Sequence, residues 1–180
     1  MNWEDYKSAH DTALNNLDLV QMNKVITIFE EVRVNGNTVW VGGNGGSAAT
    51  ASHTVADLTK TSTSGGKGTI RSIALSELVS LSTAFANDVS FEDALAESLR
   101  FLAKPTDVFL LISVSGTSPN LIRAAEAARH LGLKIISLVG ARGTEVAAVS
   151  DASLVIDSED YQVVENIHMV LIHWFVKALS

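Results

Sequence analysis

The sequence predicts an α/β domain, in which a three-layer, doubly wound, five-stranded parallel sheet follows two N-terminal helices. Three observations lead to this prediction. Short runs of β-branched and other apolar residues alternate with helical segments along the chain. Two of these runs end in turns rich in glycine or serine, and a helical segment follows each turn directly. No repeat, low-complexity stretch or linker interrupts the 180 residues, so we expect one domain over residues 1–180.

The elements are expected in a regular order. Residues 1–35 form a helical pair, in which the first helix covers residues 3–17 and the second shows apolar residues at helical spacing between Val25 and Val32. Helices are also expected between the strands and over residues 163–179. The five strands are expected over residues 38–41, 70–75, 108–113, 135–139 and 153–156.

Two of the turns have the composition of phosphate-binding loops. Residues 43–47 read Gly-Asn-Gly-Gly-Ser, and residues 113–118 read Ser-Val-Ser-Gly-Thr-Ser before Pro119, which suits the first position of a helix. Glycines let the backbone approach a ligand, and free N–H groups at a helix start favour an anion. Either turn alone could be an ordinary connection between strand and helix. Two of them at one edge of a sheet favour a phosphate site.

Composition excludes several classes of protein. Hydrophobic residues make up 47% of the chain, which excludes disorder, and no apolar run reaches the length of a membrane span. The absence of cysteine excludes disulfides, thiolate nucleophiles and cysteine-ligated zinc, and it fits a cytoplasmic protein. The formal charge of −7 argues against nucleic-acid binding. An anionic ligand must therefore be held by local amides and hydroxyls.

The two turns resemble those of the sugar isomerase (SIS) domain family, and the similarity is closest to its phosphoheptose isomerase branch. It extends over nearly the whole chain, including the leading helices and the histidine-containing last helix. The resemblance implies a flavodoxin-like fold and a cytoplasmic homotetramer with active sites between subunits. It also implies interconversion of sedoheptulose 7-phosphate and D-glycero-D-manno-heptose 7-phosphate by proton transfer through an enediolate.

The resemblance and the composition of the turns together give a set of site residues. Zinc is the metal we expect, and the four metal positions are His53, Asp57, Glu165 and His173. Asp57 would be the catalytic base and His173 the acid. The substrate-binding positions are Asn44, Gly45, Gly46, Ser47, Asn87, Asp88, Ser113, Val114, Ser115, Ser118 and Glu165.

Two metal positions depart from the usual residues of the family. Asp57 stands where a glutamate is usual, and Glu165 stands where a glutamine is usual. His53 and Asp57 are one helical turn apart, so both can face one point. The shorter aspartate could move the base by about 1 Å, a shift that can lower the rate on the order of a hundredfold. Glu165 and His173 lie about 12 Å apart along a straight helix, so one metal between them needs a distorted helix start or another subunit.

The last helix is apolar over most of its surface, which indicates burial on several sides and hence packing between subunits. His168 lies five residues before His173 and would face another direction, so we assign it no part in the site.

Two further functions compete with an isomerase. One is a non-catalytic SIS protein that binds sugar phosphates or serves as an adaptor, as the relative that binds the replication initiator does. The other is a nucleotide-binding oxidoreductase, because Gly43, Gly45 and Ala48 match part of the dinucleotide fingerprint. We set it aside because the acidic Glu77 comes more than thirty residues after Gly43, rather than about twenty. No nucleotide cofactor is expected.

Overall fold

The computed structural model describes the backbone of residues 1–180 and the side chains of residues 1–63 and 66–180. Its centre is a parallel sheet of five strands in the order β2-β1-β3-β4-β5, which is the flavodoxin-like order. The strands are β1 (Thr38–Gly42), β2 (Arg71–Ala74), β3 (Val108–Ser113), β4 (Lys134–Gly140) and β5 (Ala152–Ile156). The predicted fold class is therefore confirmed.

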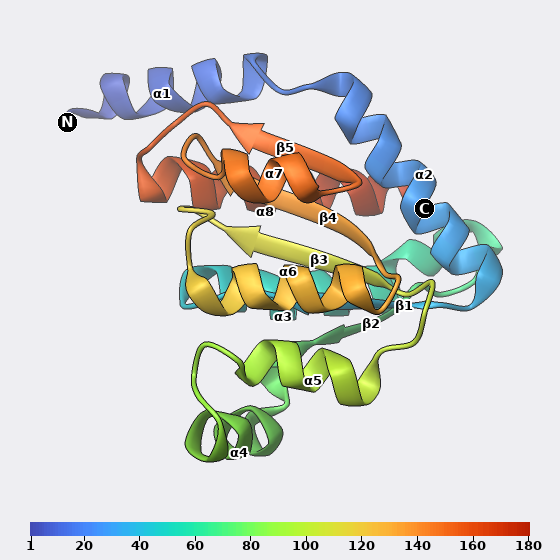
Figure 1. Cartoon of the computed structure of the whole chain (residues 1–180). Coiled ribbons are helices and arrows are strands. Elements are labelled where there is room, and N and C mark those ends of the chain that lie inside the picture. The colour runs from blue at the N-terminus through green and yellow to red at the C-terminus, as the bar shows by residue number, and fades with distance from the viewer.

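Helices cover both faces of this sheet (Figure 1). One face carries α3 and α8 together with α2, and the other carries α5, α6 and α7. The helices are α1 (Trp3–Asn15), α2 (Leu19–Asn35), α3 (Gly46–Lys60), α4 (Val79–Asp88), α5 (Ala94–Leu102), α6 (Pro119–His130), α7 (Thr144–Val149) and α8 (Tyr161–Leu179), with 3-10 turns η1 (Thr61–Gly66) and η2 (Leu75–Glu77). The result is the predicted three-layer arrangement, with α1 and α2 at its start.

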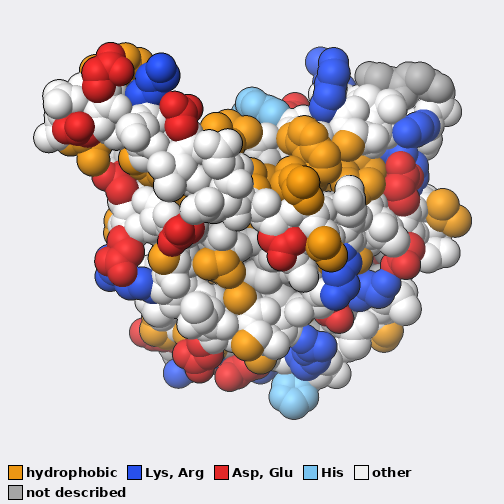
Figure 2. Space-filling model, turned by 90° about the horizontal axis from the view of Figure 1, so that it is seen from above, with side chains coloured by type: hydrophobic (Ala, Val, Ile, Leu, Met, Phe, Trp, Pro, Cys, Tyr) orange, Lys and Arg blue, Asp and Glu red, His pale blue; other side chains and the backbone are white. Residues whose placement is uncertain are grey.

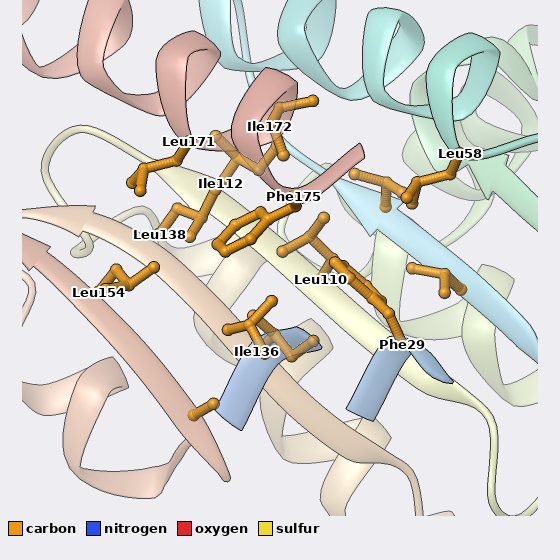
Figure 3. Packing of buried hydrophobic residues seen from close by; sticks show 14 of the residues in the cluster. Phe29, Leu58, Leu110, Ile112, Ile136, Leu138, Leu154, Leu171, Ile172 and Phe175 are labelled. Carbon is orange, nitrogen blue, oxygen red and sulfur yellow. The ribbon is translucent and has the colours of Figure 1, made fainter. Parts of the chain in front are cut away.

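Each face of the sheet has its own hydrophobic core, because successive side chains of a strand point to opposite faces. In β3, Leu110 and Ile112 join the core under α2 and α8, while Phe109 and Leu111 join the core under α5 and α6. Figure 3 shows the first of these cores, in which Phe29 of α2 meets Phe175 of α8. Their rings are 6.0 Å apart in an edge-to-face contact. Every residue of β3 is buried, as expected for a central parallel strand.

Polar caps set several helix boundaries that apolar patterns cannot show. The Asp160 side chain accepts hydrogen bonds from the backbone of Gln162 and Val163, so α8 begins at Tyr161, two residues earlier than predicted. The first helix ends at Asn15 rather than residue 17, because Asp18 caps the start of α2. These differences leave the order of the elements unchanged.

The last helix is buried mainly within its own chain. Its apolar residues form one broad buried face, and the large apolar side chains of α8 that stay exposed among the described residues are Tyr161, Val170 and Trp174. The apolar composition of α8 is therefore mostly explained by packing within one chain, and a subunit interface on its exposed residues stays a prediction.

Candidate functional site

The two predicted phosphate loops lie side by side at the carboxyl edge of the sheet. The first follows β1 and the second follows β3, and these strands are paired neighbours at the point where the strand order reverses. Open α/β sheets bind ligands at such a point. A cavity of about 310 Å³ lies there. It is lined by Asn44, Gly45, Gly46, Ser47, Ser113, Val114, Ser115, Ser118, Tyr161 and Glu165.

The first loop leaves the start of α3 open to an anion. Gly45 has a φ of 52°, which favours glycine, and no side chain caps the helix that begins at Gly46. The earliest intrahelical bond from this turn is donated by the Ala48 amide to the Gly45 and Asn44 carbonyls. The backbone amides of Gly46 and Ser47 precede Ala48 in the helix and have no carbonyl partner within it, as is usual at a helix start. Both residues line the cavity, so their amides can bind an anion there.

The second loop offers hydroxyl groups to the same cavity. The Ser113 Oγ accepts a hydrogen bond from the Gly116 amide at 3.0 Å, and the Ser115 Oγ accepts one from the Thr117 amide at 3.2 Å. A hydroxyl that accepts in this way still has its proton to donate. Ser118 stands at the N-cap of α6, but its side chain makes no capping bond. Three hydroxyls can therefore donate to an oxyanion.

A pair of amide side chains ties the two loops together. Asn44 Nδ2 donates to Asn120 Oδ1 at 2.9 Å, and Asn120 Nδ2 donates to Asn44 Oδ1 at 2.8 Å. Asn120 is only 3% exposed. This reciprocal pair fixes the spacing between the first loop and the start of α6.

Glu165 of α8 lies directly against the first loop. A Cβ atom added at Gly46 would be 2.2 Å from Glu165 Oε1, so a larger residue at this position would displace the carboxylate from the first loop. Glu165 therefore places a negative charge beside the free amides of α3, where it also narrows the cavity.

A second group of predicted residues meets farther along α3 and α8. The donor atoms of His53, Asp57 and His173 all lie within 4.8 Å of one another. His53 Nε2 is 3.3 Å from Asp57 Oδ2 and 3.1 Å from His173 Nε2, and His173 Nε2 is 3.8 Å from the same carboxylate oxygen. Asp57 is half-buried and both histidines are exposed. The carboxylate therefore faces two imidazoles at the surface.

These three side chains have the chemistry of a divalent metal site. Two imidazoles and one carboxylate are ligands that zinc accepts, and a catalytic zinc site keeps a further position open for water or substrate. The close approach of two ring nitrogens and one carboxylate oxygen shows that a single ion could contact all three. This group could thus hold a metal ion.

Other predicted site residues lie apart from these two groups. Glu165 is not part of the His53 group, because it contacts Gly46, about two helical turns of α3 away. Within one chain, the described structure therefore brings together three of the four predicted metal ligands. Asn87 and Asp88 are exposed at the end of α4, where Asn87 Nδ2 donates to Asp88 Oδ1 at 2.8 Å. Neither lines the cavity between the loops.

Two residues of the site were missed by the sequence analysis. Asn120 follows Pro119 inside a predicted helix, and no local pattern reveals that it pairs with a loop far away in the chain. Tyr161 lines the cavity from the first turn of α8. Tyr161 comes four residues before Glu165, and this spacing places both on one helical face. The spacing could therefore have predicted that Tyr161 lies near the site.

His168 lies in the core and has no place in either group. It is fully buried, and neither ring nitrogen makes a hydrogen bond of normal geometry with a described residue. Burial lowers the pKa of its imidazole from 6.5 to about 4, while the nearby backbone of Val139 raises the pKa in part. His168 is therefore neutral near pH 7.

Comparison with known proteins identifies relatives of the chain. A family model described as the SIS domain matches residues 5–140. A probable phosphoheptose isomerase of Thermoplasma volcanium is 34% identical over 180 residues, covering 100% of this chain and 91% of that protein. The phosphoheptose isomerase of Helicobacter pylori strain P12 is 34% identical over 168 residues, covering 93% and 86%. The solved phosphoheptose isomerase of Neisseria gonorrhoeae has a TM-score of 0.89 and 27% identity, covering 98% and 94%.

Proposed function

The chain belongs to the SIS domain family, and we propose that it is a sugar-phosphate isomerase of the phosphoheptose isomerase type. The proposed reaction interconverts sedoheptulose 7-phosphate and D-glycero-D-manno-heptose 7-phosphate. Relatives named phosphoheptose isomerase that cover nearly the whole chain support this choice of substrate.

One observation about α3 and α8 carries the proposal. The two helices pack against each other, so Gly46 and Glu165 meet at one end, while His53, Asp57 and His173 meet farther along. His53 is seven residues after Gly46, which corresponds to roughly 10 Å along the helix. An extended seven-carbon sugar phosphate can span this distance. Its phosphate would lie between the serine and glycine loops, with its carbonyl end at the carboxylate and imidazoles.

The residues of the second group suit aldose–ketose isomerisation. We infer that Asp57 removes a proton from C1 of the ketose, exchanges it with water at the enediolate stage, and delivers a proton to C2. His173 exchanges the proton between the two sugar oxygens through its other ring nitrogen, because Nε2 faces the carboxylate and is the atom available to a metal. The reaction moves two hydrogens within one molecule, so it needs no external oxidant or reductant.

Zinc is the metal that we propose for this group, with His53, Asp57 and His173 as ligands from one chain. When bound there, it would supply positive charge for the sugar oxygens. Glu165 is proposed as a substrate contact next to the phosphate loops, where its carboxylate would accept a hydrogen bond from a sugar hydroxyl, and a metal role for it would require another subunit.

A tetramer also remains part of the proposal. Figure 2 shows apolar side chains gathered on one face of the molecule. Val170 and Trp174 of α8 are 46% and 39% exposed, beside the His173 group. An interface covering them would shield the exposed histidines from water, as the chemistry of an enediolate favours. In the part of the chain that the structure describes, every helix is too short or too polar to span a membrane.

A non-catalytic sugar-phosphate binder is the alternative, and the short side chain of Asp57 is the observation that favours it. The test compares variants of the two groups in steady-state kinetics and calorimetry. Replacing Ser115 and Ser118 together by Ala should weaken sugar-phosphate binding by about 2–4 kcal/mol, because charge-assisted hydrogen bonds are lost. Asp57→Asn should remove turnover and leave binding in place, and Thr117→Ala in the same loop is the matched control.

Asp57→Glu separates the two functions further. If the short aspartate limits proton transfer, the glutamate variant should turn over faster. Sugar-phosphate affinity that does not change in the double serine variant would contradict the proposed phosphate site.

A further inference from the structure

A second polar cavity lies at the other edge of the sheet, where the strands begin. Its volume is about 240 Å³. It is bounded by the starts of β1 and β2 and by the turn that joins α5 to β3. Its polar lining comes from Asn37, Thr38, Arg71, Lys104 and Asp107, and its apolar lining from Trp40, Ile73 and Leu102. This cavity shares no residue with the one between the phosphate loops.

Two cationic side chains line this cavity. Arg71 and Lys104 are both exposed, and within the described part of the chain neither side chain forms an ion pair or a hydrogen bond. Most other arginines of this acidic chain are paired with a carboxylate, as Arg100 is with Glu97. Two unpaired positive charges at one concavity attract an anion, and a guanidinium can donate two parallel hydrogen bonds to phosphate.

The carboxylate of Asp107 does not neutralise these cations directly. It is 3% exposed and accepts hydrogen bonds from Thr38 N at 2.9 Å, Trp40 Nε1 at 2.9 Å and Lys104 N at 3.0 Å. Both of its oxygens are therefore occupied by N–H donors on the floor of the cavity. Its bond to the Lys104 backbone also fixes the turn that carries the lysine.

The same turn contains a strained residue. Thr106 has a φ of 76°, and it is the non-glycine residue with positive φ among the described residues. This conformation is unfavourable for a β-branched side chain and needs support from its surroundings. Asn37 Nδ2 donates to Thr106 Oγ1 at 2.9 Å, and the Thr106 amide donates to the Gly132 carbonyl at 3.3 Å. The turn is thus held in one shape beside the cavity.

We propose that this cavity binds the phosphate group of a small metabolite, at a site separate from the isomerase site. Arg71 and Lys104 supply two positive charges, which match a phosphate dianion better than a single carboxylate. Trp40, Ile73 and Leu102 provide an apolar wall for the carbon part of the ligand. Because the site lies at the start of the strands, its ligand does not compete with a sugar phosphate at their carboxyl edge.

Inorganic phosphate is the probe for the test. The full chain is labelled with ¹⁵N, and its backbone amide signals are followed during a phosphate titration. Amides of Asn37 and Thr38 report on the proposed site, and the amide of Ser115 reports on the loop site. In the wild type, we expect the chemical shifts of both sets of amides to change as phosphate is added and to reach a plateau. Arg71→Gln with Lys104→Gln should weaken binding at Asn37 and Thr38 by about tenfold to a hundredfold.

Two controls make the result specific. Lys7→Gln with Lys24→Gln removes the same charge from exposed positions elsewhere, and it should leave both sites unchanged. Ser115→Ala with Ser118→Ala should remove the shifts at the loop site alone, so a failure of the proposed isomerase site is seen separately. Wild-type amides of Asn37 and Thr38 that do not respond to phosphate would overturn the proposal. Equal weakening by the cavity variant and the charge control would also overturn it.

Discussion

Protonation of the buried His168 should make the fold less stable in mild acid. In the unfolded chain its pKa has the ordinary value of 6.5, and in the folded chain burial lowers the pKa to about 4. Between these values the unfolded chain binds more protons, so stability is full above pH 6.5 and is lost as the pH falls toward 4. One pKa unit corresponds to about 1.4 kcal/mol, and the loss between pH 7 and pH 5 is therefore about 2 kcal/mol.

Urea unfolding followed by tryptophan fluorescence measures this effect. The wild type and His168→Leu are compared at pH 7 and pH 5, at one protein concentration and with a chelator present, so that metal loss does not contribute. Between pH 7 and pH 5, the unfolding free energy of His168→Leu should fall by about 2 kcal/mol less than that of the wild type. His130→Gln, at an exposed histidine of α6, should behave like the wild type. An equal pH dependence in wild type and His168→Leu would refute the reasoning.

Three further predictions concern the two residue groups and the assembly. His53→Ala should abolish stoichiometric zinc uptake in metal analysis, and wild-type protein that takes up no zinc, manganese or nickel would contradict the metal site. Gly46→Ala should displace the carboxylate end of the flexible Glu165 side chain at little cost in stability and so change sugar-phosphate affinity in calorimetry; unchanged affinity would argue against a role for the Glu165 contact. Trp174→Glu should dissociate the proposed tetramer in light scattering, whereas a folded wild-type monomer would rule the tetramer out.

The fold could be predicted because local and global signals agree in this chain. Residues 108–113 form a strand with the predicted bounds, and their continuous apolar character matches burial on both faces of a parallel sheet. The two loops were located from glycine and serine content, which follows the backbone needs of a turn from strand to helix. The start of α8 was predicted too late, because Asp160 sets it through a side-chain cap rather than through an apolar pattern.

The site could be predicted only in part from the sequence, because its geometry also depends on how helices distant in sequence pack together. The spacing of His53 and Asp57 placed both on one helical face, and packing of α3 against α8 adds His173 to them. The position of Glu165 against Gly46 depends on the alignment of the two helices along each other, which sequence spacing does not give. The distance along α8 nevertheless indicated that Glu165 and His173 could not easily share one ion.

The central claim is that Asp57 moves a proton between C1 and C2 of a sugar phosphate held by the two loops. Incubation of the purified chain with zinc and sedoheptulose 7-phosphate in D₂O, followed by NMR, tests it directly. The account predicts the aldose product with deuterium at C2, and neither product nor deuterium exchange with Asp57→Asn. Wild-type protein that binds the sugar phosphate but forms no aldose and exchanges no deuterium would contradict the account.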